Sequence, residues 1–259
     1  MHRLAIVVTL LVTVGALAQN SPVSDPFAVT LAQQSVLALT GGIPLSDVTL
    51  NANAISVLGS DGGTGTATLK AKGVSESRID LALSKWTKSD IRNALSGVPS
   101  GVWIKDGGTP NAYAIHNSWT DAPWFFPALS SLTQTLNPNF IFKYIGQEQH
   151  SGITVQHIRV FQIVPSDTKD EFQTARLSAT NFYLDSTTSL PMAESFRTHP
   201  DNDMNTDIDI EIRFGNYQAV SGVQIPFRVQ RMLHGNVVLD LTVTSAVVNS
   251  GLTDVLFSF

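Results

Sequence analysis

The chain has 259 residues, of which 43% are hydrophobic and 14% charged, and it contains no cysteine. These values exclude a disulfide scaffold, a thiolate metal site and a disordered chain. Lys and Arg total 16 against 21 Asp and Glu, a formal net charge of −5. This acidic balance argues against a nucleic-acid-binding protein, because such proteins normally present a basic face.

The N-terminus predicts a secretory signal peptide. Residues 2–3 are basic, residues 4–14 are nearly all apolar, and residues 16–18 read Ala-Leu-Ala, which matches the small-x-small cleavage pattern. The apolar run is shorter than the roughly 20 residues that a membrane-spanning helix needs. We therefore expect a signal peptide at residues 1–18, a single exported domain at residues 19–259 in the periplasm or outside the cell, and no transmembrane segment in the processed chain.

The first predicted helix begins near Pro26. Asp25 is suited to the N-cap and Pro26 to the first helical position, while Gly41 and Gly42 end the helix. Its spacing predicts one apolar face, formed by Phe27, Leu31, Leu37 and Leu39.

From Val48 onward the hydrophobic period changes from 3.6 to 2, which predicts antiparallel strands joined by glycine-rich turns. Alternation is strictest over residues 207–214, 223–230 and 237–247. Such alternation buries one face of a sheet and leaves the other in water. Pro226 cannot donate to a ladder, so its strand should lie at an edge or carry a bulge there.

A second helix is predicted over residues 123–135, where aromatic side chains are most concentrated. As a lid over an apolar ligand, this segment would supply the candidate ligand-binding residues Trp119, Trp124, Phe125, Phe126 and Leu129. The alternative is ordinary packing of the same rings in the core. A polar stretch at residues 166–176 predicts one exposed helical turn.

The predicted elements indicate a mainly β (α+β) fold. A helix of about 14 residues is about 21 Å long and covers two or three strands at their spacing of about 4.8 Å. Two or three helices cannot cover the apolar face of about a dozen strands, so we expect a curled antiparallel sheet or incomplete β-barrel. Hydrophobic ligands use interiors of this kind.

Short patterns in the last third of the chain resemble a known family. Residues 181–185 (Asn-Phe-Tyr-Leu-Asp), 190–191 (Leu-Pro), 215–217 (Gly-Asn-Tyr) and 223–228 (Val-Gln-Ile-Pro-Phe-Arg) are similar to the late strands of outer-membrane lipoprotein-sorting proteins of the LolA/LolB type. The resemblance implies an incomplete barrel capped by helices that shelters acyl chains during transit through the periplasm. Unlike the membrane-anchored receptor form, this chain has no cysteine for lipid attachment.

The acidic run at Asp201, Asp203, Asn205 and Asp207 resembles the opening of a calcium-binding loop. Thr206 stands where that loop needs glycine, and Ile212 stands where it needs a bidentate glutamate. We therefore expect a solvated loop here and no metal.

No pattern of catalytic residues is visible. The five histidines after the signal peptide lack metal-ligand spacing on a shared helix, and no Gly-x-Ser-x-Gly elbow occurs. We expect a non-enzymatic exported protein without a cofactor, which binds an apolar or acyl-bearing partner, a lipid or lipoprotein. The alternatives are a cell-envelope structural or interaction module with a filled core and, more weakly, a hydrolase whose triad is not visible in the sequence.

Overall fold

The computed structural model describes residues 22–57, 59, 62–164 and 168–259. The signal peptide expected at residues 1–18 lies outside these described residues, so it stays a prediction. Within them, no helix is both long and apolar enough to cross a membrane.

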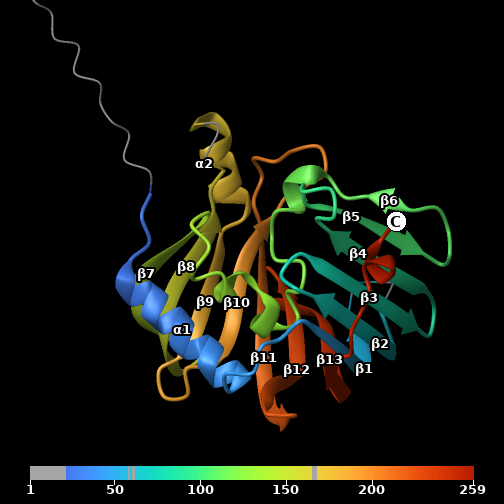
Figure 1. Ribbon diagram of the computed structural model, residues 1–259. Helices are drawn as coiled ribbons and strands as arrows, with labels where there is room; N and C mark the ends of the chain where they lie inside the picture. The colour runs from blue at the N-terminus through green and yellow to red at the C-terminus, as the bar shows by residue number, and fades with distance from the viewer. Residues whose placement is uncertain (1–21, 58, 60–61, 165–167) are drawn as a thin grey trace, which may run out of the picture.

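Thirteen antiparallel strands form one sheet in the described part of the chain (Figure 1). In chain order they are β1 (Asp47–Ser56), β2 (Gly63–Lys72), β3 (Glu76–Leu83), β4 (Thr87–Asn93), β5 (Ser100–Lys105), β6 (Asn111–Ala112), β7 (Phe140–His150), β8 (Ile153–Gln162), β9 (Thr180–Asp185), β10 (Pro191–Thr198), β11 (Ile208–Val220), β12 (Val223–Leu233) and β13 (Asn236–Val248). Across the sheet the order is β6-β5-β4-β3-β2-β1-β13-β12-β11-β10-β9-β8-β7.

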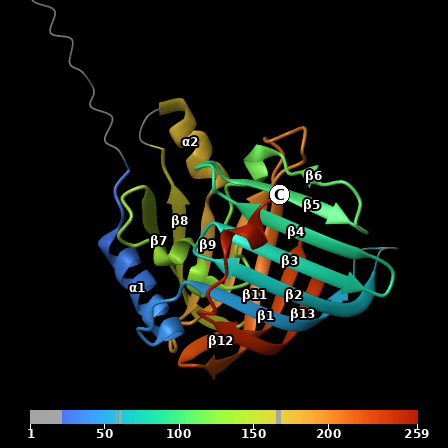
Figure 2. The same cartoon turned by 45° about the vertical axis from the view of Figure 1, so that its right-hand side comes forward.

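One long-range pairing sets the topology. Neighbouring strands are consecutive in the chain except β1 and β13, which place Val48 opposite Val248. Because of this pairing, β6 and β7 form the two opposite edges of the sheet although they follow each other in the chain. The connection between them, residues 113–139, must pass from one edge to the other, and it crosses the hollow side of the sheet (Figures 1 and 2).

The sheet is curled, as predicted. Ile79 of β3 and Arg92 of β4 line the same small cavity as Phe196 of β10, although β4 and β10 stand seven places apart in the strand order. A flat sheet at a spacing of about 4.8 Å per strand could not bring them together. The sheet is therefore an unclosed half-barrel, with its apolar core on the concave side.

The first helix, α1 (Pro26–Thr40), has the predicted ends. The Asp25 carboxylate accepts a hydrogen bond from the Phe27 N–H at 2.9 Å, and Gly41 ends the helix with a left-handed φ of 59°. The predicted apolar face is confirmed for Leu39, which is fully buried, and for Leu31, which packs against the core, but it is wrong for Phe27 and Leu37, which are 50% and 61% exposed. The other buried residues of the helix are Ala28, Ala32, Ser35 and Thr40, small side chains that let the helix lie close to its neighbours.

The second predicted helix is absent from the described residues 123–135. This stretch holds only two 3₁₀ turns, η3 (Pro127–Leu129) and η4 (Ser131–Thr133). Pro127 would break an α-helical ladder, and Ser130 Oγ accepts a hydrogen bond from the Leu132 N–H at 3.3 Å instead. Conversely, the predicted single turn at residues 166–176 is too short, since α2 (Thr168–Leu177) has 10 residues.

The prediction that Pro226 marks an edge strand or a bulge is wrong for the strand as a whole, since β12 lies between β11 and β13. However, β13 pairs with β12 only from Arg228 onward, whereas Pro226 is paired with Tyr217 of β11. At Pro226 the strand is therefore locally an edge, so the missing N–H breaks no ladder.

Candidate functional site

Residues 119–135, called the plug below, fill the hollow of the half-barrel. Phe125 and Phe126 are fully buried, and Trp124 and Leu129 are nearly so, in one hydrophobic core with strands from both halves of the sheet. Trp119 is half-buried and lines a separate recess. The structure thus brings four of the five predicted ligand-binding residues together in the interior, within irregular backbone. Their contact with a ligand stays a prediction.

Arg92 of β4 holds the start of the plug in place. Its guanidinium donates hydrogen bonds to the backbone carbonyls of Ser118 at 2.8 Å, Thr120 at 2.7 Å and Asp121 at 3.1 Å. Burial lowers the pKa of Arg92 to about 10, while the Asp121 carboxylate opposes this shift. Arg92 therefore remains a cation at neutral pH.

Asp121 closes the plug on itself. Its carboxylate accepts hydrogen bonds from the Ser131 N–H at 3.1 Å and the Ser131 hydroxyl at 2.8 Å. Burial raises the pKa of Asp121, although these hydrogen bonds and the Arg92 charge lower it in part. The plug is thus a compact loop secured by a small number of polar contacts.

An open apolar groove lies between α1 and the plug. It has a volume of about 630 Å³, and its lining includes Val36, Leu37 and Ile43 on one side and Ala128 and Leu129 on the other. Leu37 is 61% exposed, whereas Leu129 belongs to the buried core. The groove is therefore a surface feature beside α1 whose lining includes the buried Leu129 of the plug.

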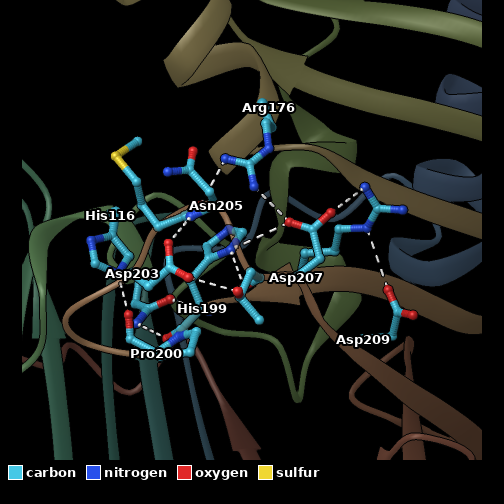
Figure 3. Close-up of polar contacts among 12 residues, drawn as sticks. His116, Arg176, His199, Pro200, Asp203, Asn205, Asp207 and Asp209 are labelled. Atoms are coloured by element: carbon cyan, nitrogen blue, oxygen red, sulfur yellow. Dashed lines mark hydrogen bonds and ion pairs between the residues drawn. The ribbon is translucent and has the colours of Figure 1, made fainter.

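The acidic loop that resembles a calcium site in sequence is held by other contacts (Figure 3). The Asp203 carboxylate accepts hydrogen bonds from the Asn205 N–H at 2.9 Å and the Thr206 hydroxyl at 2.6 Å. The Asp207 carboxylate lies 2.6 Å from Arg176 and 2.8 Å from Arg197. Across the ranges that the structure describes, no group of three or more His, Asp or Glu side chains is placed to hold a metal ion.

His199 differs from the other histidines because its ring is almost completely buried, with 1% of the side chain exposed. Its Nδ1 donates to the Thr206 carbonyl at 3.0 Å, whereas its buried Nε2 has no hydrogen-bond partner among the described residues. His150 and His157 instead pack against the Tyr183 ring, at 4.1 and 4.6 Å between centroids. In the described part of the chain, no hydrogen bond joins an imidazole to a serine hydroxyl.

Glu194 of β10 is a buried acid that sequence reasoning missed. It lies opposite Phe182 and Ile212 in the sheet register, so its side chain shares their fully buried face. Neither carboxylate oxygen has a hydrogen-bond partner within the described residues. Burial raises the pKa of Glu194 well above its usual range, and the charge of Asp121 acts in the same direction. The environment favours the neutral acid.

Arg92 and Arg231 were also missed, although Arg231 left a signal in the sequence. Arg231 has the same two-residue spacing as the inward-facing Val223, Ile225 and Val229. A charged residue therefore occupies a position where this alternation predicts an apolar one. Arg92 gave no such signal, because Lys88 and Asp90 share its face of β4.

Comparison with known proteins identifies the fold. The sequence matches no protein-family model and no curated protein. Among solved structures, one described as an outer-membrane lipoprotein-sorting protein domain from Vibrio parahaemolyticus matches with a TM-score of 0.56 and 13% identity, over 89% of this chain and 95% of that chain. The chain has a LolA-like fold. A LolA superfamily protein from Nitrosomonas europaea (11% identity, 90% and 97% covered) and a DUF1329 family protein from Desulfovibrio piger (11%, 90% and 96%) each align with a TM-score of 0.49.

In this LolA-like fold, the hollow of the half-barrel, the groove beside α1 and the buried charges lie around the same segment. The groove is lined by the plug through Ala128 and Leu129, and Arg92 is bonded to the backbone at the start of the plug. The candidate site is therefore the plug together with the walls that it contacts.

Proposed function

We propose that this protein is an exported, non-enzymatic binding protein of the periplasm or cell exterior that takes up an apolar or acyl-bearing ligand, a lipid or the acyl chain of a lipoprotein, in its half-barrel. The observation that carries the proposal is the apolar groove between α1 and the plug. It is open to solvent at Leu37, and its lining includes Leu129, which belongs to the buried core.

The plug is held in the hollow by few polar contacts, so such a ligand can replace it. It contains only the two three-residue turns η3 and η4 as helical structure, and its polar anchors are mainly Arg92 and the Asp121–Ser131 contact. The wall behind it is mainly apolar on both halves of the sheet, with Glu194 as a buried exception. Burial of an acyl chain there would contribute about 0.8 kcal/mol for each CH₂ group, which would offset the cost of moving Phe125 and Phe126 out of the hollow.

Two measurements test the proposal. Organic extraction of the purified protein followed by mass spectrometry should release a bound lipid, and a fluorescent fatty-acid probe should bind and be displaced by lipids. Leu37→Glu places a charge in the groove without disturbing the core, so it should weaken probe binding at least about tenfold, or about 1.4 kcal/mol.

Val255→Glu is the matched control, because Val255 is also exposed, at 79%, but does not line the groove. It should bind the probe like the original protein. Absence of both extractable lipid and displaceable probe would contradict the proposal, as would equal losses in the two variants.

The complete burial of Phe125 and Phe126 favours a second candidate, a cell-envelope structural or interaction module whose hollow stays filled. In that case no probe binds at any concentration, and the backbone amides of the plug exchange as slowly as those of the central strands. Probe binding and hydrogen exchange at the plug therefore separate the two functions.

A further inference from the structure

A small polar cavity adjoins the plug on the concave side of the sheet. Its volume is about 230 Å³, and its walls come from β3, β4, β10 and β12, the plug, the segment before the plug that holds Tyr113 and Asn117, and the loop after β10. Cavities for drug-sized ligands are usually larger, at about 300–1,000 Å³. This cavity therefore suits a single small group, and its polar lining indicates which chemistry that group has.

The guanidinium of Arg231 on β12 has no hydrogen-bonding or ion-pair partner among the described residues. The group lies 5.3 Å from the centroid of the Trp124 ring. Burial lowers the pKa of Arg231, and only Asp90 opposes this shift. A planar fork of N–H donors held in a partly desolvated place is the arrangement that binds carboxylate and phosphate oxygens.

Arg92 supplies a second positive charge in the same cavity. The hydrogen bonds that it makes go to neutral carbonyl oxygens, which leave its charge in place. Arg92 and Arg231 line the same cavity, and the resulting repulsion between their like charges lowers the pKa of Arg92 further. An anion between them would relieve that repulsion.

The acidic groups around the cavity are already engaged or lie at its rim. Asp90 accepts a hydrogen bond from the Tyr113 hydroxyl and lies 3.0 Å from Lys88 Nζ. Asp121 is hydrogen-bonded to Ser131, as described above. Asp201 lines the cavity from an exposed position. Apart from the exposed Asp201, Arg231 is therefore the charged group of this cavity that forms no hydrogen bond or ion pair with a described residue.

His199 adds a buried nitrogen to this wall. Asn117 fixes the backbone of His199 from both sides, because its side-chain amide donates to the His199 carbonyl and accepts from the His199 N–H, each at 2.8 Å. Since Nδ1 is committed to the Thr206 carbonyl, Nε2 is the unpartnered ring atom of a residue that lines the cavity. With its proton on Nδ1, the ring leaves Nε2 as a hydrogen-bond acceptor, so this buried nitrogen marks a place for a ligand atom that carries a proton.

We infer that this cavity binds an oxyanion, a phosphate or carboxylate group, through the guanidinium of Arg231 and the charge of Arg92, while His199 Nε2 accepts a hydrogen bond from a protonated oxygen where the ligand is a phosphate. Trp124 connects the cavity to the hollow, because one face of its ring meets Arg231 while its edge-to-face contact with Phe125, at 5.8 Å, belongs to the plug. On the proposed function, on which this step rests, the oxyanion is the headgroup of an acyl ligand whose chain replaces the part of the plug that follows Trp124, so that the walls of the cavity stay in place.

Titration of the purified protein with inorganic phosphate, followed by calorimetry and tryptophan fluorescence, tests the site. Arg231→Met keeps most of the side-chain volume but removes the charge, so it should weaken phosphate binding at least tenfold, and Arg231→Lys should restore part of it. Arg228→Met is the matched control, since Arg228 lies on the same strand but is exposed and paired with Asp240 at 2.8 Å. It should stay within twofold of the original protein.

A pair of lipids with the same acyl chain identifies the source of the oxyanion. A lysophosphatidic acid that binds at least tenfold more tightly than both inorganic phosphate and the matched monoacylglycerol indicates a lipid headgroup. Equal affinities for lysophosphatidic acid and inorganic phosphate indicate a free anion, and they support the cavity while contradicting an acyl ligand.

The site and the proposed function can fail separately. If monoacylglycerol and lysophosphatidic acid bind equally, and neither phosphate nor acetate changes the heat or the fluorescence, the oxyanion site is overturned while acyl binding stands. Equal phosphate affinities of Arg231→Met and the original protein also overturn the site. If phosphate binds through Arg231 but neither lipid binds, the site stands and the proposed function falls.

Discussion

Two buried acids show how local partners decide the behaviour of a single residue. Asp47, at the start of β1, is almost fully buried, and its carboxylate accepts hydrogen bonds from the Ser250 N–H at 2.7 Å, the Ser250 hydroxyl at 2.8 Å, the Gly251 N–H at 3.0 Å and the Ser46 hydroxyl at 2.9 Å. Burial alone would raise the pKa of Asp47, but these hydrogen bonds lower it on balance. Glu194 has no such donors, so burial determines its protonation.

Asp47→Asn should destabilise the protein at neutral pH by about 2 kcal/mol, because hydrogen bonds to a charged group contribute about 1.5–3 kcal/mol each and the amide can replace only part of them. The lowered pKa of Asp47 means that this stabilisation is present above the unfolded-state pKa of about 3.9 and is lost as the pH falls through the folded-state pKa. Urea unfolding at pH 7 and pH 3 should show the difference from the original protein shrinking in acid. A constant difference would contradict the assignment.

Glu194→Gln should have the opposite pH dependence. The raised pKa of Glu194 makes the folded state hold a proton that the unfolded state loses above about pH 4.3, so stability falls as the pH rises toward the folded-state pKa. Relative to the original protein, Glu194→Gln should therefore gain stability by up to about 1.4 kcal/mol per pH unit over that interval. Denaturant midpoints between pH 4 and 8 measure this gain. Asp209→Asn, whose side chain is 74% exposed, serves as the control and should show no such trend.

At the scale of elements, the sequence predicted what backbone chemistry and alternation determine. Asp25 and Gly41 fixed the ends of α1, and period-2 runs located most strands. The plug was misassigned because its apolar content outweighed Pro127 and the serines, which favour 3₁₀ turns closed by side-chain hydrogen bonds. The buried face of α1 was assigned correctly at Leu31 and Leu39 but wrongly at Phe27 and Leu37, because small residues, which give weak hydrophobic signals, form much of that face.

Two strand glycines should respond differently to alanine. At Gly65 of β2 an added Cβ would lie 2.0 Å from the backbone oxygen of Ala82, whereas at Gly215 of β11 it would meet nothing within 4 Å. Gly65→Ala must therefore displace β3 and should cost about 1–3 kcal/mol, as overpacking does. Gly215→Ala should change the free energy of unfolding by less than about 0.5 kcal/mol. Urea unfolding of both variants measures this, and equal costs would contradict the predicted close approach of β2 and β3.

At the scale of the whole molecule, the candidate site depends on contacts that no local pattern encodes. The pairing of β1 with β13 makes β6 and β7 the edges of the sheet, and only this arrangement sends the plug across the hollow. Likewise, Arg92, Arg231 and His199 come from β4, β12 and the loop after β10, and they meet because the sheet curls. The curl was predictable because the chain has too few helices to cover so many strands. The residues that the curled sheet brings together were not predictable.

If the plug and an acyl ligand compete for the same hollow, ligand binding must shift the plug toward an open state. Hydrogen exchange at the amides of residues 124–132 should therefore become faster when a monoacylglycerol binds, while the amides of β11, β12 and β13 keep their rates. Asp121→Asn weakens the contact with Ser131 and should raise the open fraction, and apparent affinity rises in proportion to that fraction. A tenfold larger open fraction thus gives tenfold tighter binding together with lower stability. Ligand binding that leaves the plug amides as slow as in the free protein would place the ligand outside the half-barrel.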